Sequence, residues 1–286
     1  MRLIKMTGGL GNQMFIYAFY LAMRKRFPKT RIDLSDMMHY RAHNGYELHR
    51  VFDLPKDEFC INQTLKKVVE FLFFKTIIER KQDLTTLKAF TKDYAWPLIY
   101  FKGFFQSERY FKNIENEVRQ TFTFRPEKAN EASQRLRKQI LADPNSVSLH
   151  VRRGDYLLPQ FWDNIGCMCT LEYYLTAVDE LRKRVANPHF YVFSDDLPWV
   201  RENIPLDHAV YVDCNSGSDS WQDMMLMSCC RHNVLGNSTF SWWGAWLNPN
   251  PEKTVVAPKK WFANSDTPYI LPQEWTGVSV ANPPTH

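Results

Sequence analysis

Two adjacent arginines, a glycine and an aspartate directly follow an apolar run in the middle of the chain, in the segment His150-Val-Arg-Arg-Gly-Asp-Tyr156. The residues from Val147 to Val151 are typical of a buried strand, and the glycine and charges mark its abrupt end. In open α/β sheets, ligands bind beyond the carboxyl ends of the strands. Each guanidinium presents a fork of donors that matches phosphate oxygens, so the arginine pair suits a doubly charged anion. A solvated surface turn would explain the same residues, and the local pattern does not separate the two interpretations.

Two further polar loops follow predicted strands in the same half of the chain. Ser194-Asp195-Asp196 follows one strand, and Asn237-Ser238-Thr239-Phe240 follows another. Arginine would bind a diphosphate, a carboxylate would accept from a base or a ribose, and hydroxyls at a helix start would bind phosphate. Taken singly, Asp196 and Ser238 would be ordinary helix caps, and Phe240 would be either a base-stacking ring or a core residue. Three loops at one sheet edge favour a nucleotide-sugar site.

A glycine-rich turn near the N-terminus, Gly8-Gly9-Leu10-Gly11-Asn12-Gln13, joins the apolar run Leu3–Met6 to an apolar helical stretch. Its glycines permit a tight turn and let a ligand approach the helix N-terminus, whose free N–H groups favour anions. Gly9-Leu10-Gly11 also begins a dinucleotide-binding fingerprint, in which Asp33 would hold a ribose. Met14 occupies the position of the third glycine, which argues against a nicotinamide-dependent oxidoreductase, and this class stays an alternative.

Strands alternate with helices in the second half, which predicts a parallel sheet. The expected elements are a helix at Glu127–Leu141, the strand at Val147–Val151, a helix at Leu171–Val185, a strand at His189–Phe193, a helix from Pro198, a strand at Ala209–Val212, a helix at Ser220–Cys230, a strand at Asn233–Leu235 and a last strand at Thr254–Ala257. The first half is expected to add an amphipathic helix at Val68–Ile78, a strand at Ile99–Phe101 and a helix through Tyr110 and Val118 with Ser107 as N-cap. The best boundary is Phe122–Pro126, which gives an N-terminal domain over residues 1–126 and a C-terminal domain over residues 127–286.

The composition indicates a folded globular protein, because 44% of its 286 residues are hydrophobic and 15% are aromatic. A net charge of +5, spread along the chain, fits a local cationic pocket better than a nucleic-acid partner. The six cysteines form no CxxC pair, which disfavours a disulfide framework or a zinc site. Since no signal segment or spanning segment is recognisable, we expect a cytoplasmic protein and leave peripheral contact at the inner membrane face open.

Four segments together resemble the bacterial α-1,2-fucosyltransferases of glycosyltransferase family 11. They are Gly8-Gly-Leu-Gly-Asn-Gln-Met-Phe15, His150-Val-Arg-Arg-Gly-Asp-Tyr156, Val192-Phe-Ser-Asp-Asp196 and Asn237-Ser-Thr-Phe-Ser-Trp-Trp-Gly-Ala-Trp-Leu247. They occur in the order typical of that family, over a chain of family length. Ile16 departs from the glutamine that often stands at this position. Residues 36–100 carry no matching motif, and acceptor choice is expected to reside there.

The resemblance implies an α/β fold of the GT-B-like type, in which two Rossmann-type domains with parallel sheets face each other and the second holds GDP-β-L-fucose. The implied enzyme is a galactoside 2-alpha-L-fucosyltransferase (EC 2.4.1.-), which transfers L-fucose with inversion to the 2-hydroxyl of a terminal galactose on a glycan acceptor. Fixed cations aimed at the departing diphosphate stabilise the transition state more than the ground state. Arginine would therefore take the role of a metal, and we expect neither a metal nor another cofactor.

By the same resemblance, Arg152 binds the β-phosphate and is catalytic together with Asp155 and His150, which order the loop or the nucleotide. The residues implied for GDP-fucose binding come from the glycine turn and the three loops: Gly11, Asn12, Gln13, Arg152, Arg153, Asp195, Asp196, Asn237, Ser238, Thr239 and Phe240. Arg153 alternatively holds the loop. The general base stays open among Asp155, His39, His43 and other residues of the first half.

Two alternative functions differ from this enzyme, one in the linkage formed and the other in the class of protein. One is a fucosyltransferase of another linkage that shares the arginine loop. The other is a non-catalytic sugar-binding module that uses the run Trp242-Trp243-Gly244-Ala245-Trp246, although three tryptophans at a helix start favour a core position.

Overall fold

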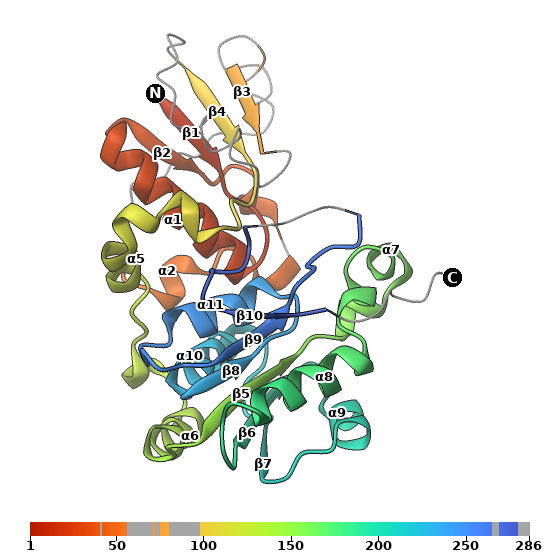
Figure 1. The fold of residues 1–286 in the computed structure, drawn as a ribbon. Helices are drawn as coiled ribbons and strands as arrows, with labels where there is room; N and C mark the ends of the chain where they lie inside the picture. The colour runs from red at the N-terminus through yellow and green to blue at the C-terminus, as the bar shows by residue number, and fades with distance from the viewer. Residues whose placement is uncertain (41, 56–70, 72–74, 80–97, 265–268, 280–286) are drawn as a thin grey trace. The chain divides into compact units, whose positions relative to one another are not determined.

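The computed structural model describes most of the chain, namely residues 1–40, 42–55, 71, 75–79, 98–264 and 269–279. These residues form two compact units. The first runs from Met1 to Phe124 and includes Tyr269 and Ile270, and the second begins at Arg125. Each unit contains one parallel sheet with helices (Figure 1). The predicted α/β class with a parallel sheet in each half is confirmed.

Four short strands form the sheet of the first unit, in the order β2-β1-β4-β3 (Figure 1). They are β1 (Arg2–Lys5), β2 (Thr30–Asp33), β3 (Lys75–Ile78) and β4 (Ile99–Lys102). The strand β1 is central, because Leu3 is in register with Arg31 of β2 and with Tyr100 of β4. Leu3 and Ile4 are buried, as expected for a central parallel strand.

Strand β3 lies where the sequence pattern predicted the end of an amphipathic helix at Val68–Ile78, so that prediction is wrong for Lys75–Ile78. Most of the remainder of the predicted helix lies outside the described residues. Lys75–Ile78 pairs in parallel with Ile99–Lys102, and the β-branched residues of this segment suit a strand. A short apolar run does not distinguish strand from helix, and here the pairing with β4 decides.

Helix α1 (Leu10–Arg26) follows the glycine turn and is buried over most of its length. Gly8 has a left-handed φ of 81°, and a Cβ there would lie 2.8 Å from the amide nitrogen of Asn12, so the turn requires glycine. Met14 is fully buried. The helix therefore packs on the core through a long side chain at the position where a dinucleotide-binding helix would place a glycine.

Short helical segments complete the first unit. They are 3₁₀ turns at Met37–His39, Ala42–Asn44, Glu108–Tyr110 and Lys112–Ile114, and the helices α2 (Leu48–Val51) and α5 (Glu115–Thr121). The Ser107 side chain accepts from the Arg109 backbone N–H, which confirms Ser107 as an N-cap. The predicted continuous helix is divided, because Phe111 and Ile114 have φ values of −136° and −128°.

Six parallel strands form the sheet of the second unit, in the order β10-β9-β8-β5-β6-β7 (Figure 1). They are β5 (Ser146–Val151), β6 (His189–Ser194), β7 (Ala209–Val212), β8 (His232–Val234), β9 (Val255–Pro258) and β10 (Thr276–Val278). The predicted alternation is confirmed. The expectation that the strand now seen as β9 would be the last is wrong, because three residues of the tail add β10 beside it.

Helices cover both faces of this sheet. They are α6 (Glu131–Ala142), α8 (Leu171–Arg182), α9 (Leu197–Asn203), α10 (Trp221–Cys229) and α11 (Thr239–Leu247). The short helix α7 (Pro159–Trp162) packs instead against the 3₁₀ turns at Gly154–Leu157 and Gly166–Met168. Alternate residues of β5, among them Leu149 and Val151, pack with Tyr173 and Tyr174 of α8. The intervening residues, including His150, face the other side, where α10 packs against α6 and α11.

The tryptophan run belongs to the core of the second unit. Trp242 and Trp243 are fully buried, and Trp246 is 2% exposed. Their rings contact one another, with centroids 5.0 to 6.0 Å apart. The run therefore does not offer a sugar-stacking surface, and the prediction of a core position is confirmed.

The C-terminal tail contributes to both units. Tyr269 belongs to the first, where its carbonyl accepts a 2.6 Å hydrogen bond from the Ser107 hydroxyl and its ring lies 3.7 Å from the guanidinium of Arg109. Strand β10 belongs to the second. Of the helices in the described residues, none combines the length and apolarity needed to span a bilayer.

Candidate donor-binding site

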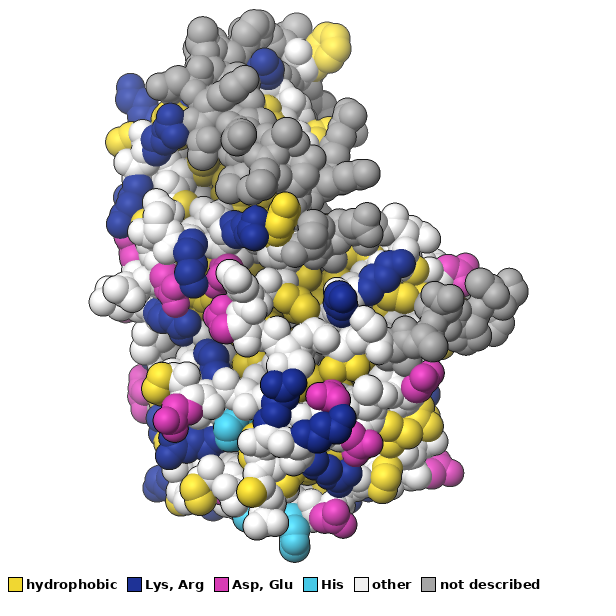
Figure 2. All heavy atoms as spheres, in the orientation of Figure 1, with side chains coloured by type: hydrophobic (Ala, Val, Ile, Leu, Met, Phe, Trp, Pro, Cys, Tyr) yellow, Lys and Arg dark blue, Asp and Glu magenta, His cyan; other side chains and the backbone are white. Residues whose placement is uncertain are grey.

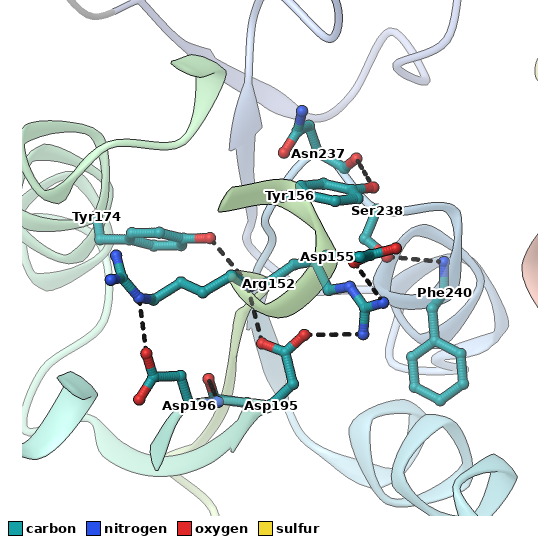
Figure 3. Close-up of polar contacts among 11 residues, drawn as sticks. Arg152, Asp155, Tyr156, Tyr174, Asp195, Asp196, Asn237, Ser238 and Phe240 are labelled. Atoms are coloured by element: carbon teal, nitrogen blue, oxygen red, sulfur yellow. Dashed lines mark hydrogen bonds and ion pairs between the residues drawn. The ribbon is translucent and has the colours of Figure 1, made fainter. Parts of the chain in front are cut away.

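The three polar loops predicted from the sequence meet at the carboxyl edge of the second sheet. They follow β5, β6 and β8, which are neighbours in the sheet. Figure 3 shows Arg152 of the first loop between Asp155 and Asp195, with Asn237, Ser238 and Phe240 of the third loop beside them.

Arg152 is held by two carboxylates. One terminal nitrogen, Nη2, lies 2.7 Å from Asp155 Oδ1, and the other, Nη1, lies 2.9 Å from Asp195 Oδ2. The Tyr156 ring centroid is 5.7 Å from its Cζ. The side chain is 31% exposed, and a guanidinium carries five N–H donors, so donors remain for a ligand. The arrangement is a fixed cation with an accessible side.

Arg153 takes a different direction. Its Nε lies 3.0 Å from Asp196 Oδ2, and its Cζ stacks 3.8 Å from the centroid of the Trp199 ring. Asp196 also caps α9 by accepting from the Trp199 backbone N–H. Arg153 and Asp196 thus have structural partners that hold the loop, and direct contact of either with a donor stays a prediction.

Asp195 connects the first two loops. Its Oδ1 accepts from the Arg153 backbone N–H at 2.8 Å, and its Oδ2 pairs with Arg152. A Cβ on Gly154 would lie 2.5 Å from Asp195 Oδ2, so a glycine is needed for this close approach. Since Asp195 and Asp196 point their carboxylates at different arginines, they do not form a paired ligand set for a metal.

Two tyrosines that the sequence analysis did not single out support the site. Tyr174 Oη accepts from the Arg152 backbone N–H at 3.3 Å, and a Cβ on Gly236 would lie 2.9 Å from the same oxygen. Tyr156 donates to the Asn237 carbonyl at 3.3 Å. Burial raises the pKa of both phenols, which keeps them neutral donors and acceptors. Tyr174 occupies a core position of α8, and such spacing carries no signal of a functional role.

The third loop is fixed by its own hydrogen bonds. The Asn237 amide nitrogen donates to the carbonyls of Ile165 and Trp261 at 2.9 and 3.0 Å, and its backbone N–H donates to Cys169 Sγ. Asn237 Oδ1 is buried without a hydrogen-bond partner among the described residues. Ser238 caps α11 by accepting from the Phe240 N–H at 3.3 Å, and Thr239 is the first residue of that helix.

His150 lies beneath the loops. It is 7% exposed, its ring centroid is 6.0 Å from that of Phe240, and its Nδ1 has no hydrogen-bond partner in the described part of the chain. Burial, reinforced by the charge of Arg152, lowers the pKa of His150 to about 3. The imidazole is therefore neutral near pH 7, which fits a hydrogen-bonding role and not that of an imidazolium acid.

The glycine turn belongs to the first unit. Gln13 is fully buried, and its amide nitrogen donates to the carbonyls of Gly8 and Gly45 at 2.8 and 2.7 Å. Its Oε1 accepts from the Glu47 N–H at 2.9 Å. Gln13 thus orders the turn and the loop beside it. Asn12 is partly exposed, and its Oδ1 accepts from the Gln106 amide at 2.8 Å. Gly11 is buried in the first turn of α1.

Asp33, which would hold a ribose in the dinucleotide-binding interpretation, has another role. Asp33 is 1% exposed, and its carboxylate accepts from the Ser35 backbone N–H at 2.9 Å and from Tyr100 Oη at 2.7 Å. A carboxylate engaged inside the core is not available to a ribose. The structure therefore disfavours a nicotinamide enzyme.

The surface charges are mixed. Among the described residues on the face drawn in Figure 2, Lys and Arg side chains are interspersed with Asp and Glu and do not form one continuous stripe. A surface that follows a nucleic-acid backbone would concentrate positive charge. The half-buried cationic loop around Arg152 is the more specific anion-binding feature.

The chain is similar to proteins of one known family. The model of the family described as Glycosyl transferase family 11 matches residues 1–279. An alpha-1,2-colitosyltransferase of Escherichia coli is 32% identical over 96% of this chain and 97% of its own, and the O-antigen biosynthesis glycosyltransferase WbnK of Escherichia coli is 27% identical over 96% and 99%. The structure of NodZ alpha-1,6-fucosyltransferase soaked with GDP-fucose superimposes with a TM-score of 0.54 at 13% identity, over 87% of this chain and 92% of that one, which shows a shared fold. The chain therefore belongs to glycosyltransferase family 11.

Proposed function

We propose that the protein transfers L-fucose from GDP-β-L-fucose to the 2-hydroxyl of a terminal galactose, with inversion. The observation that carries this proposal is the fixed Arg152 at the carboxyl edge of the second sheet, between Asp155 and Asp195. A relative named for α-1,2 transfer, which matches nearly the whole chain, supports the linkage.

The chemistry requires stabilisation of a leaving diphosphate. Glycosyl transfer passes through an oxocarbenium-like state while negative charge develops on the departing group. The unpaired N–H donors of Arg152 would bind the β-phosphate where that charge develops. Asp155 and Asp195 would act as positioning residues, because they set the direction of the guanidinium without touching the sugar.

The remaining residues of the edge would bind the nucleotide. Phe240 would stack on the base, and Asn237, Ser238 and Thr239 would line the GDP site. The buried unpaired oxygen of Asn237 and the buried unpaired nitrogen of His150 support this, because such atoms in the described chain favour a ligand that supplies donors. Asn12, from the first unit, would contact a phosphate. In this proposal residues 127–286 hold the donor and residues 1–126 hold the acceptor.

The name of one bacterial relative, an O-antigen biosynthesis glycosyltransferase, favours an acceptor that belongs to an O-antigen. We expect the protein to act in the cytoplasm, and peripheral contact with the inner membrane face stays open. The expected acceptor depends on the name of a relative and not on the site.

A second donor has one specific observation in its favour. The relative that is 32% identical over nearly the whole chain is named for transfer of colitose. Colitose lacks the 3-hydroxyl of fucose, and a site built to hydrogen-bond a hydroxyl rejects an analogue without it by about 10⁴–10⁵. Comparing rates with GDP-fucose and GDP-colitose on one galactose-terminated acceptor therefore separates the two donors sharply.

The decisive experiment is incubation of the protein with GDP-fucose and lactose, followed by NMR of the product. We expect an α-1,2 linkage to galactose. Another linkage would contradict the proposal while keeping the donor. Isothermal titration should detect binding of GDP and not of NAD, and binding of NAD alone would favour the oxidoreductase alternative.

A further inference from the structure

The loops that follow the four strands of the first unit are tied together by polar side chains. Gln13 joins the loop after β1 to the loop after β2, through the carbonyl of Gly45. Asn12 and Gln106 join the loops after β1 and β4. Glu79, directly after β3, joins the loop after β4. Side-chain hydrogen bonds therefore connect all of these loops in the described part of the unit.

Glu79 fixes the loop after β4. Its Oε2 accepts from the backbone N–H groups of Phe104 and Phe105 at 2.9 and 2.6 Å, and its Oε1 accepts from Tyr110 Oη at 2.8 Å. A Cβ on Gly103 would lie 2.5 Å from Glu79 Cβ, so only glycine fits beside this carboxylate. The carboxylate therefore determines the backbone of the loop.

Phe105 has an unusual backbone conformation. Its φ is 52°, which is a rare left-handed conformation for a bulky residue. Its ring is fully buried and stacks on Phe19, with centroids 3.9 Å apart. Such a conformation persists only where the surroundings determine it, and these positions cluster at functional sites. As Phe105 is buried, the preceding Phe104 is left 43% exposed on a fixed backbone.

The loop after β2 is held in a comparable way. His43, Asn44 and Gly45 have φ values of 52°, 64° and 72°, so three successive residues are left-handed. Gln13 holds the carbonyl of Gly45. A Cβ on Gly9 would lie 3.1 Å from His43 Cβ and 3.2 Å from its Cγ, which places the exposed imidazole against the glycine turn. The centroid of the His43 ring lies 6.5 Å from that of the Tyr40 ring.

We propose that these loops bind the terminal galactose of the acceptor, with the Phe104 ring against the apolar face of the sugar and the His43 imidazole accepting a hydrogen bond from one of its hydroxyls. The inference rests on the function proposed above and assigns the acceptor side to named residues. One face of a β-galactoside presents several C–H groups, and these complement the negative face of an aromatic ring. Sugar sites combine such an apolar platform with a few fixed polar groups. Phe104 lies two residues before Gln106, which donates to Asn12, and His43 lies against the glycine turn that precedes Asn12, so the loops supply one group of each kind.

The test measures the KM for lactose at saturating GDP-fucose. Phe104→Ala should raise this KM about tenfold, because the stacking surface is lost, while Phe104→Trp should stay close to wild type. His43→Ala should raise it severalfold. GDP affinity, measured by isothermal titration, should be unchanged in all three variants, since they alter only the acceptor side.

Two matched controls separate the site from general surface effects. Phe161→Ala removes an exposed phenylalanine of α7, and His208→Ala removes an exposed histidine with a left-handed φ of 55°. Both controls should leave the KM for lactose unchanged. An unchanged KM in Phe104→Ala and His43→Ala, in variants with wild-type melting temperatures, would overturn the inference, as would equal effects of the controls.

Failure of the proposed function would be recognised separately, as absence of fucose transfer to lactose by the wild-type protein. In that case saturation-transfer NMR with lactose tests the site directly. Binding to the wild type that is lost in Phe104→Ala supports the site, and absence of binding or equal binding by both proteins refutes it.

Discussion

The Asp195 carboxylate pairs with the Arg152 guanidinium at 2.9 Å across two neighbouring loops of the second sheet. Its other oxygen holds the Arg153 backbone N–H at 2.8 Å. One acidic residue thereby sets both the backbone of the arginine loop and the direction of the cation. This edge of the sheet is a preorganised unit and not a set of independent surface charges.

Replacing Arg152 should nearly abolish sugar transfer. Loss of one donor aimed at developing charge typically costs about 10²–10³ in rate, so Arg152→Ala should fall by at least this factor in kcat/KM. Arg152→Lys should recover little, because an ammonium cannot reproduce the planar fork. Circular dichroism would verify the fold, and near-normal turnover of the alanine variant would refute the diphosphate role.

Arg153 offers the matched comparison. Its guanidinium is held by Asp196 and Trp199, so Arg153→Lys should cost much less activity than Arg152→Lys. Parallel kinetics of the two lysine variants would check this. Equal losses would show that both arginines contact the donor.

Gly154→Ala should damage activity more than stability. The new Cβ would lie 2.5 Å from Asp195 Oδ2, and the carboxylate can move only by giving up its contact with Arg152. We expect a loss of about tenfold or more in kcat/KM with a small change in melting temperature. Gly217→Asn is the control, because no atom lies within 4 Å of a Cβ there and asparagine tolerates the left-handed backbone. Unfolding of Gly154→Ala would contradict this expectation.

His150 should make the protein acid-sensitive. Its pKa is about 3 in the folded protein, against 6.5 for an ordinary histidine, so the unfolded chain binds a proton more readily. Stability is therefore complete above pH 6.5 and falls as the pH is lowered towards 3, with a slope of up to about 1.4 kcal/mol per pH unit. Urea unfolding of wild type and His150→Gln between pH 4 and 7 would measure this. An identical slope for the two proteins would contradict it.

Glu79→Ala should destabilise the protein by about 2–3 kcal/mol, because it leaves the Phe104 and Phe105 N–H groups without their acceptor. Glu79→Gln retains an acceptor oxygen and should cost less. Denaturant unfolding gives both values. Equal stabilities of wild type and Glu79→Ala would show that the carboxylate does not maintain the left-handed Phe105.

The meeting of the three polar loops at one sheet edge could be predicted because it depends on local sequence patterns. A buried strand followed directly by Arg152 and Arg153, or by Asp195, predicts a loop at the edge of a sheet. Because the strands are parallel, their carboxyl ends bring such loops to the same edge. Tyr174 could not be predicted, since a residue in the core spacing of α8 looks the same whether or not its hydroxyl meets a functional loop. Strand β10 is too short to show alternation.

The loops of the first unit, which we propose bind the acceptor, were less accessible to sequence reasoning. Glu79 ends a segment whose apolar run suits a helix as well as a strand, and only the pairing of β3 with β4 places it beside Phe104. His43 lies in a loop without periodicity, where a backbone angle, and not a residue pattern, marks its importance. Long-range pairing and backbone strain are the two kinds of information that residue spacing does not contain.

The C-terminal tail has a consequence for how family members can be recombined. Tyr269 belongs to the first unit, through Ser107 and Arg109, whereas β10 completes the sheet of the second. A chimera with a single junction near Phe124 would take its first unit from one relative. The residue that corresponds to Tyr269 would come from the other relative. With the acceptor on the first unit, as proposed above, exchange of acceptor preference between relatives calls for two grafts, one up to residue 124 and one short piece around residue 269, transferred together.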